Sequence, residues 1–293
     1  MAKPFLKWAG GKSWLIEHIE PLLPPYLSSN SFTYVEPFVG SGAMLFWFLD
    51  RFPKMEKAII NDLNGDLINV YRTIALQPEE LISILDILQK EYHLLEDDED
   101  GKKIYYYDKR DKFNLRNCSN VDHAALFIFL NRTCFNGLYR VNKSNKYNVP
   151  MGRYKNPTIC DRSNLLAVSE ALKKVEIRCG DYADTLIESG NPIYYFDPPY
   201  KPISVSSSFG AYTKDGFGDG DQLRLKEFCD ILDGKGYNWF LSNSDVRENG
   251  GDNFFDDMYS KYNILRVNAK RSINSNKDGR GLVSEIIINN IYL

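Results

Sequence analysis

Cysteine and histidine are scarce in this sequence, and neither is clustered. The 293 residues contain five cysteines and three histidines, and no two cysteines form a Cys-x-x-Cys pair. A disulfide framework or a zinc site is therefore not indicated, and no metal site is predicted. Reduced thiols in a cytosolic protein are the simpler interpretation.

Long apolar runs are also missing. The longest purely apolar run covers the seven residues 124–130, whereas a membrane-spanning helix needs about 20. The first dozen residues lack the apolar stretch of a signal peptide. We therefore expect a cytoplasmic protein without a membrane partner.

An excess of positive charge is absent from the chain as a whole. Lys and Arg together number 36, Asp and Glu number 39, and the formal net charge is −3. Proteins that bind nucleic acids usually carry a basic surface, and the average hides one here. Residues 102–178 contain 16 Lys or Arg but only 6 Asp or Glu, so the middle of the chain is suited to an anionic partner.

Strand and helix patterns alternate at both ends of the chain. Strands are predicted at 32–37, 57–61, 175–179, 192–196, 237–241, 264–267 and 283–289. Helices are predicted from about residue 43 to Phe52, from a cap at Ser163 to Lys174, and over 221–232. Such alternation predicts an α/β fold with a mostly parallel sheet and helices on its faces.

This alternation is interrupted between residues 72 and 157. Helical spacing of apolar residues continues to Tyr92, and two further helices are expected at about 105–118 and 122–132. An acidic run at 96–100 predicts a solvated loop. Residues 131–157 are rich in Asn, Gly, Lys and Arg, so we predict an inserted, mainly helical module with a hairpin.

The tetrapeptide Asp197-Pro198-Pro199-Tyr200 follows a predicted buried strand. Two prolines would end a strand in any protein, but this combination also suits the amino group of a planar base. Asp197 and the Pro198 carbonyl would accept its two N–H bonds, and Tyr200 would stack on the ring. Because open α/β sheets bind ligands at the carboxyl ends of their strands, we predict a catalytic site here.

A second candidate is the segment 36–42, which joins a predicted strand to a predicted helix. Gly40 and Gly42 permit a tight turn at the helix start, but Leu45 stands where a dinucleotide fingerprint needs a third glycine. Asp62 ends the next strand, where an acid is expected to hold ribose hydroxyls. A nucleoside cofactor without pyrophosphate, such as S-adenosylmethionine, fits this pattern better than a dinucleotide.

The segment 7–13 ends like a phosphate-binding P-loop. However, Leu6 occupies the position of its first glycine, and no predicted strand leads into the segment. We therefore reject a nucleotide-hydrolysing function. A Gly-Gly turn that presents Trp8 and Lys12 could instead bind a carboxylate and a flat or thioether group.

Together these motifs resemble those of the Dam-type DNA adenine-N6 methyltransferases of the alpha group, in the same order. The resembling segments are FLKWAGGK at 5–12, EPFVGSG at 36–42, DPPY at 197–200, FGAYTKDGF at 209–217, LSNSD at 241–245 and RSINSN at 271–276. NRTCFNGLYR at 131–140 and NVPMGRYKNP at 148–157 are similar to the target-recognition segment of GATC-specific members.

The resemblance implies a methyltransferase fold in two parts. Residues 1–70 and 165–293 would form a catalytic domain that binds S-adenosylmethionine, and residues 71–164 a target-recognition domain. The expected reaction is methyl transfer to the adenine N6 of GATC in double-stranded DNA, after the base has flipped out of the duplex. The enzyme would associate with the nucleoid or act for a phage in its host, with a cognate restriction endonuclease as an optional functional partner.

The same resemblance assigns three sets of residues. The catalytic set is Asp197, Pro198, Pro199 and Tyr200. The cofactor set is Trp8, Lys12, Glu36, Phe38, Gly40, Gly42, Asp62, Asp181, Tyr182 and Asp197. The DNA-binding set is Phe135, Asn136, Leu138, Arg140, Asn148, Pro150, Arg153 and Lys155. Arg140 would read the guanine, since bidentate Arg–guanine pairing is the most common specific contact in the major groove.

Other functions use the same fold. Methylation of cytosine N4, or of adenine in RNA, is the nearest alternative; the acidic first residue of the tetrapeptide favours adenine, and the recognition segment favours DNA. A catalytically silent DNA-binding regulator is a further alternative, against which the intact tetrapeptide argues. Cytosine-C5 methylation would need a cysteine nucleophile, typically after proline, and none of the five cysteines follows a proline.

Two further expectations concern loops. The loop 201–220, with Phe209 and Tyr212, is a candidate lid that orders on DNA, although an ordinary flexible loop is equally consistent with its sequence. A second basic stretch at 261–280 could contact the opposite side of the duplex, and a solvated loop is its alternative.

Overall fold

The computed structural model describes residues 1–8, 12–202, 216–270 and 282–291. Phe209 and Tyr212 of the expected lid, the segment 271–276 and most of the segment 209–217 lie outside these ranges. Within them, no helix is both long and apolar enough to cross a membrane. All five cysteines are described, and none forms a disulfide.

Seven strands form one sheet in the order β3-β2-β1-β4-β5-β7-β6. The strands are Phe32–Glu36 (β1), Met55–Ile60 (β2), Val175–Ile177 (β3), Pro192–Phe196 (β4), Asn238–Ser244 (β5), Asn263–Lys270 (β6) and Leu282–Asn289 (β7). Strands β1 to β5 pair in parallel, and β7 runs antiparallel to both β5 and β6. The predicted mostly parallel sheet is therefore confirmed.

The centre of the sheet contains a topological switch point. Strands β1 and β4 are neighbours, but the chain continues from β1 towards β2 and from β4 towards β5, on opposite sides. The crevice outside the carboxyl ends of such a strand pair is where open α/β sheets bind ligands. Both conspicuous motifs of the sequence, at 36–42 and 197–200, follow these two strands.

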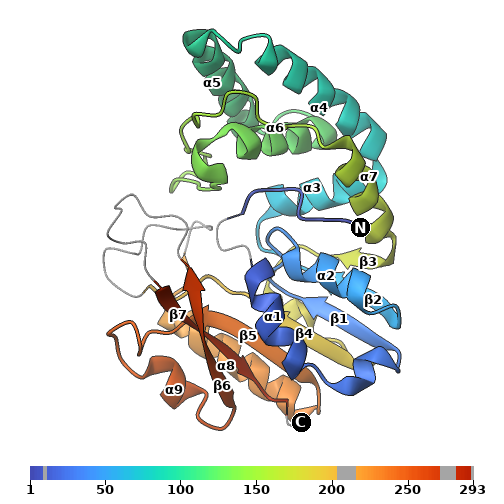
Figure 1. Cartoon of the computed structure of the whole chain (residues 1–293), viewed down its shortest axis with the longest axis vertical. Helices are drawn as coiled ribbons and strands as arrows, with labels where there is room; N and C mark the ends of the chain where they lie inside the picture. Colours follow the sequence, from blue (N-terminus) through green and yellow to red (C-terminus); the bar gives the residue numbers. More distant parts are fainter. Residues whose placement is uncertain (9–11, 203–215, 271–281, 292–293) are drawn as a thin grey trace.

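Helices cover the sheet and extend beyond it (Figure 1). They are Ile16–Ile19 (α1), Ala43–Arg51 (α2), Gly65–Leu76 (α3), Pro78–His93 (α4), Glu99–Leu115 (α5), Asn120–Thr133 (α6), Arg162–Ala171 (α7), Asp219–Gly234 (α8) and Phe254–Met258 (α9). Short 3₁₀ turns occur at Ser13–Leu15, Glu20–Leu22, Pro25–Ser28, Phe135–Gly137, Leu172–Lys174 and Tyr182–Thr185.

Two helix starts differ from the sequence predictions. Helix α7 is capped by Asp161, whose Oδ1 accepts a first-turn N–H at 3.2 Å, and not by Ser163, whose hydroxyl donates to that carboxylate. Helix α5 begins at Glu99, inside the acidic run, because Asp98 accepts a first-turn N–H at 2.8 Å. In both cases a carboxylate suits the positive end of the helix dipole.

Successive strand residues face opposite sides of the sheet, and each side has its own core. Tyr34 and Tyr195 pack in the cluster that includes apolar residues of α2 and α3. Val35 and Tyr194 pack in the cluster that includes α8 and α9. Both faces of the central strands are therefore buried, and their carboxyl ends are held rigidly.

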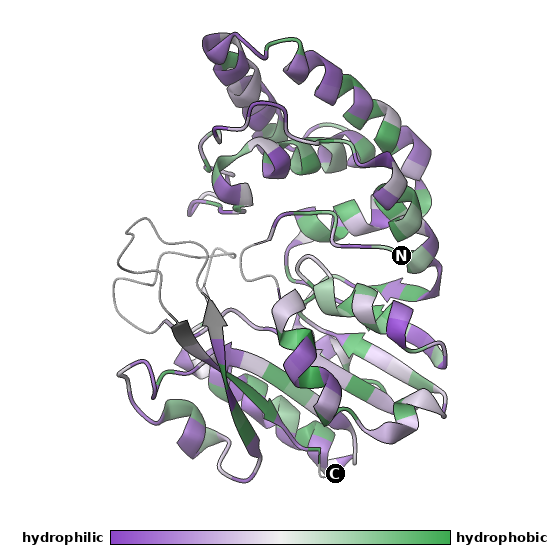
Figure 2. Cartoon of the chain, viewed as in Figure 1, coloured by the Kyte–Doolittle hydropathy of each residue, from purple (hydrophilic) through white to green (hydrophobic). Residues whose placement is uncertain are grey.

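Helices α4, α5 and α6 lie together above α3 in Figure 1. Helix α6 is buried along most of its length because it packs against α3, α4 and α5, whereas the outer helix α5 is largely hydrophilic in Figure 2. A hairpin follows α6, with antiparallel bridges between Cys134 and Met151 and between Val141 and Tyr147. The predicted helical insertion with a hairpin is therefore confirmed.

The first eight residues connect this helical part to the sheet. The Lys7 N–H donates to Asn131 Oδ1 of α6 at 2.9 Å, and the Lys3 N–H donates to Asn164 Oδ1 of α7 at 3.0 Å. The next residue, Trp8, packs beside Gly40 in the turn that follows β1.

Candidate active site

A cavity of about 490 Å³ opens beside the carboxyl ends of β1 and β4. This volume is typical of small-molecule sites. Its walls contain the whole predicted catalytic set and the whole predicted cofactor set except Gly42: Trp8, Lys12, Glu36, Phe38, Gly40, Asp62, Asp181, Tyr182, Asp197, Pro198, Pro199 and Tyr200. The structure therefore brings three distant sequence motifs to one place.

The glycine turn after β1 forms the floor of the cavity. Gly40 and Gly42 have φ angles of +48° and +72°, which favour glycine. A Cβ on Gly42 would lie 2.6 Å from the Tyr71 hydroxyl, and one on Gly40 would lie 3.0 Å from Trp8 Nε1. Gly42 directly precedes α2 and lies on the side of the turn that faces Tyr71, so it does not line the cavity.

Asp62 follows β2 and borders the same turn. Its Oδ2 accepts the N–H of Gly40 at 3.2 Å, and its Oδ1 accepts the N–H of Asn64 at 2.9 Å. Burial raises the pKa of Asp62 to about 6, although these hydrogen bonds oppose the change. Its carboxylate is thus a fixed acceptor at the cavity wall.

Glu36 is the most strongly buried acid of the site. Its Oε2 accepts a hydrogen bond from the Tyr34 hydroxyl at 2.9 Å. Burial raises the pKa of Glu36 well above its usual range, despite this bond. The side chain is therefore held inside the protein, where burial favours its protonated form.

Asp197 directly follows β4. Ser242 Oγ of β5 donates to its Oδ1 at 2.9 Å, and Lys12 Nζ lies 3.6 Å from the same oxygen. Burial raises the pKa of Asp197 to about 6, while the Lys12 charge and the Ser242 bond lower it. Asp197 is therefore mainly ionised at neutral pH and can accept hydrogen bonds.

The remainder of the tetrapeptide is held by α8, β5 and β7. Gln222 Nε2 donates to the Pro199 carbonyl at 3.1 Å, and the Tyr200 hydroxyl donates to Glu285 Oε2 at 3.0 Å. Asn243 Oδ1 accepts the next backbone N–H, that of residue 201, at 3.1 Å. The segment 241–245 thus supports the tetrapeptide from the neighbouring strand.

Lys12 is a buried cation shared by two acids. Only 7% of the residue is exposed. Its Nζ lies 3.6 Å from Asp197 Oδ1, 3.6 Å from Glu285 Oε2, and 3.8 Å from the centre of the Tyr200 ring. A single positive charge is therefore shared between the two carboxylates beside the tetrapeptide.

Asp181 and Tyr182 lie after β3, on the far side of the cavity. Arg224 of α8 donates to Asp181 through both terminal nitrogens, with Nη1 at 2.8 Å from Oδ2. Its guanidinium also lies 4.7 Å from the centre of the Tyr182 ring. The Tyr182 hydroxyl is buried and has no hydrogen-bond partner among the described residues, although Tyr182 itself borders the cavity.

Sequence reasoning missed several residues that shape the cavity: Arg224, Gln222, Ser242 and Glu285. Ser242 lies in the segment 241–245, whose only signal in the sequence is its resemblance to the methyltransferase family. Glu285 and Arg224 carry no local signal, because a lone charge on a strand or helix is typical of a solvated face. In the described ranges, no group of three or more His, Cys, Asp or Glu residues is arranged to hold a metal ion.

The predicted DNA-binding residues lie elsewhere, on the hairpin and the segment that follows it. Arg140 is exposed, and its Nε donates across the hairpin to Asn148 Oδ1 at 2.8 Å. Phe135 is 50% exposed. Leu138 and Asn148 are half-buried, and the other exposed members are Asn136, Pro150, Arg153 and Lys155.

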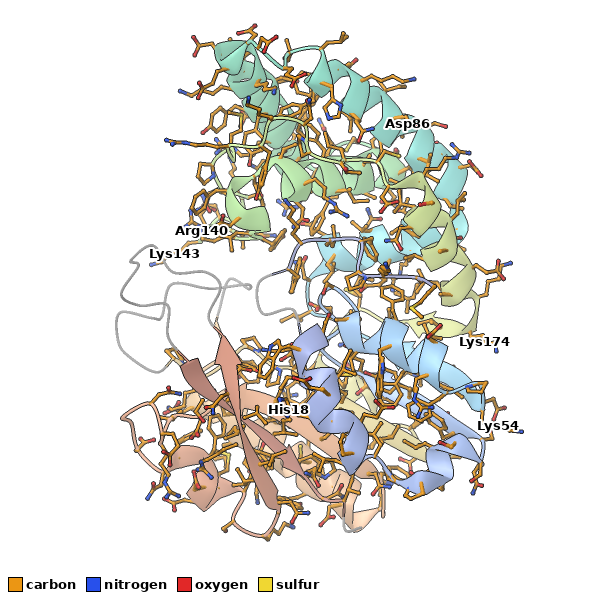
Figure 3. The ribbon with its side chains drawn as sticks, in the orientation of Figure 1. His18, Lys54, Asp86, Arg140, Lys143 and Lys174 are labelled. Carbon is orange, nitrogen blue, oxygen red and sulfur yellow. The ribbon has the colours of Figure 1, made fainter. Side chains whose placement is uncertain are left out.

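This part of the chain is free of acids. Residues 123–160 contain six Lys or Arg and no Asp or Glu. Arg140 and Lys143 lie at the edge of the helical part that faces the sheet, whereas Lys54 and Lys174 lie on the other side of the molecule (Figure 3). The hairpin therefore presents positive charge next to the acidic cavity.

Known proteins share these features along nearly the whole chain. Residues 8–273 match the model of the family described as D12 class N6 adenine-specific DNA methyltransferase. The chain is 46% identical to the type II methyltransferase M.MjaIII of Methanocaldococcus jannaschii, over 98% of this chain and 99% of that protein. It is 38% identical to the type II methyltransferase M1.LlaDCHI of Lactococcus lactis subsp. cremoris, over 98% and 95%.

A DNA adenine methylase of Serratia marcescens is 32% identical, over 97% of each chain. The family match and these identities agree with the cavity and its tetrapeptide. The chain therefore belongs to the D12 class of N6 adenine-specific DNA methyltransferases, enzymes that methylate the N6 of adenine in DNA.

Proposed function

We propose that this enzyme transfers the methyl group of S-adenosylmethionine to the adenine of GATC in double-stranded DNA. The observation that carries the proposal is the meeting of Asp197 and Tyr200 with the glycine turn and Asp62 around one cavity. Residues 1–70 and 165–293 form the catalytic domain in this proposal, and residues 71–164 form the target-recognition domain.

The lining of the cavity fits S-adenosylmethionine. The glycine turn brings its backbone to the cavity wall at Gly40, which has no side chain to fill the space. Asp62 suits ribose hydroxyls, the aromatic ring of Tyr182 suits a purine, and Lys12 suits a carboxylate. When bound, this cofactor supplies a methyl group on a positively charged sulfur.

Asp197 and the Pro198 carbonyl accept the two N–H bonds of the adenine amino group. These hydrogen bonds favour a tetrahedral nitrogen whose lone pair points at the methyl group. Tyr200 stacks on the base, and its hydroxyl bond to Glu285 fixes the ring. Positioning and electrostatics thus supply the catalysis, without a covalent bond to the enzyme.

Asp197 can also accept the proton that N6 loses on methylation. Its pKa of about 6, raised by burial, makes the carboxylate a better proton acceptor than an exposed aspartate. Ser242 donates to Oδ1, so the proton can be held at Oδ2 before it passes to solvent.

The target base must leave the duplex to reach this cavity, because its amino group is otherwise paired inside the double helix. The hairpin reads the surrounding sequence. Arg140 pairs with the guanine of GATC in the major groove, while Lys143, Lys146, Arg153 and Lys155 contact phosphates, which position the duplex without reading it.

Methyl incorporation from labelled S-adenosylmethionine tests the proposal. Duplexes with one GATC site are compared with scrambled duplexes and with duplexes already methylated at N6. Incorporation only into the unmethylated GATC duplex is expected. Equal incorporation into the scrambled duplex would contradict the target site, and no label in any duplex would contradict the cofactor.

A further inference from the structure

Asp66, in the first turn of α3, connects the cavity side of the molecule to the hairpin. Three groups from other elements converge on its carboxylate. Arg116 Nη2 lies 2.7 Å from Oδ2, the Tyr139 hydroxyl donates to Oδ2 at 3.0 Å, and His123 Nε2 lies 3.0 Å from Oδ1. Its side chain is 16% exposed.

On one side, a chain of hydrogen bonds runs from Asp66 to the floor of the cavity. Asn64 Oδ1 accepts the N–H of Asp66 at 3.1 Å, and Asp62 Oδ1 accepts the N–H of Asn64 at 2.9 Å. The other oxygen of Asp62 accepts the N–H of Gly40 at 3.2 Å. The turn that borders the cavity therefore also fixes Asp66.

On the other side, two routes lead from Asp66 into the hairpin. Arg116 uses Nη1 to donate to the Asn145 carbonyl, at the hairpin tip, at 2.7 Å. Tyr139 is buried, and its ring stacks on Trp8 of the cavity wall with centroids 5.9 Å apart and planes at 21°. Tyr139 directly precedes the exposed Arg140 on the same hairpin strand.

The carboxyl group of Asp66 is ionised at neutral pH. Burial raises its pKa, but the hydrogen bonds from His123 and Arg116 outweigh this effect and hold the pKa at about 2. The contacts around Asp66 are therefore those of a carboxylate anion.

We propose that Asp66 is a positioning residue for target selection, which fixes the distance between the base read by Arg140 and the cavity that receives the adenine. This inference rests on the function proposed above. An enzyme that methylates one base at a set spacing from another needs that spacing held, since an error of about 1 Å can cost on the order of 100-fold in rate. If the hairpin is held less firmly, the rate of methylation should fall more on the correct site than on an incorrect one.

Two variants test this role with a matched control. Asp66→Asn removes the charge at nearly constant size, and Tyr139→Phe removes one hydrogen bond while it keeps the ring beside Trp8. Glu79→Gln is the control, because Glu79 also lies in a first helical turn and pairs with an arginine, Arg162, at 2.7 Å. It is not among the residues that line the cavity.

The measurement compares kcat/KM on two duplexes. One carries the site that the wild type methylates best, and in the other the guanine–cytosine pair assigned to Arg140 is replaced. The readout is the ratio of the first kcat/KM to the second. Partial unfolding lowers both rates equally and leaves this ratio unchanged. We expect Asp66→Asn to lower the ratio roughly tenfold and Tyr139→Phe roughly threefold, while Glu79→Gln leaves it unchanged.

The outcomes separate this inference from the proposed function. Unchanged ratios in both Asp66→Asn and Tyr139→Phe, with an active and selective wild type, would overturn the role of Asp66 alone. A wild type that methylates every duplex equally would overturn the proposed target selection and, with it, this inference. If Asp66→Asn does not fold, the ratio for Tyr139→Phe decides.

Discussion

The cavity and the hairpin differ most clearly in charge. Among the described residues, six acids line the cavity beside two cations, Lys12 and Arg224; the acids are Glu36, Asp62, Asp181, Asp197, Asp221 and Glu285. The chain between residues 123 and 160 has six cations and no acid. The net charge of −3 is therefore an average over two surfaces of opposite character, and it does not argue against a DNA substrate.

The two regions also differ in how their residues are held. Asp197 and Tyr200 are fixed from behind by strands β5 and β7. Arg140 is exposed and is held within the hairpin by Asn148, above a buried layer that includes Tyr139. Burial raises the pKa of Asp197 and prepares it for chemistry, whereas exposure lets the arginine meet a base edge.

The largest expected effect concerns the cavity. Asp197→Ala should lower kcat by about 1000-fold or more, because the amino group loses its charged acceptor. Duplex binding and sequence preference in binding should persist, since the hairpin is untouched. Asp50→Ala, an exposed acid at the end of α2, is the control and should retain full activity. Loss of selective binding in Asp197→Ala would show that the two regions are not separable.

The next largest effect concerns the hairpin. Arg140→Ala should lower discrimination at the guanine position by roughly 10- to 100-fold, because one bidentate base contact is lost. The rate on the altered site should change little. The readout is kcat/KM on duplexes that differ at this base pair. Unchanged discrimination would mean that another residue reads the guanine.

The pH dependence should separate the acidic cavity from the hairpin. Because burial raises the pKa of Asp197 to about 6, protonation should lower kcat/KM as the pH falls through 6, by about tenfold per unit below it. Duplex binding, measured by fluorescence anisotropy, should show no such loss. Lys12→Met should move the acid limb to higher pH, because the Lys12 charge lowers the pKa of Asp197.

Stability should depend on pH in the opposite direction. A buried acid with a raised pKa disfavours the folded state when it is ionised, so Asp197→Asn should raise the free energy of unfolding above pH 6. The gain should vanish below about pH 4, where the carboxyl is protonated in both the folded and the unfolded state. Urea unfolding at pH 4 and pH 8 measures this difference. An equal effect at both values would contradict the raised pKa.

The smallest expected effect is on salt dependence. Lys143→Ala should reduce the slope of log Kd against log salt concentration by about one, which is the contribution of a single phosphate contact. It should weaken binding equally for all sequences. Lys54→Ala is the control, since Lys54 lies on the other side of the molecule (Figure 3). A sequence-dependent effect of Lys143→Ala would assign it to base reading.

The sequence was most informative where local chemistry is unusual. Alternating strands and helices predicted the parallel sheet, and the tetrapeptide after β4 and the glycine turn after β1 predicted the cavity. Ser163 and Asp161 are both good helix caps two residues apart, and only the backbone conformation selects Asp161. Sequence patterns do not distinguish between two possible caps that lie so close together.

Contacts between distant segments could not be predicted in this way. Glu285 meets Tyr200 only because β7 inserts between β5 and β6. Asp66 meets Arg116 and Tyr139 only because α3 packs beneath the helical part. These acids look like ordinary surface charges until the tertiary structure removes them from solvent.

The division between a catalysing cavity and a selecting hairpin can be tested most directly by methylation of a duplex library in which the four-base site is randomised. Wild-type enzyme should methylate GATC almost alone, and Arg140→Ala should spread methylation to sites that differ at the guanine. An Arg140→Ala profile identical to that of the wild type, with a uniformly lower rate, would contradict this division.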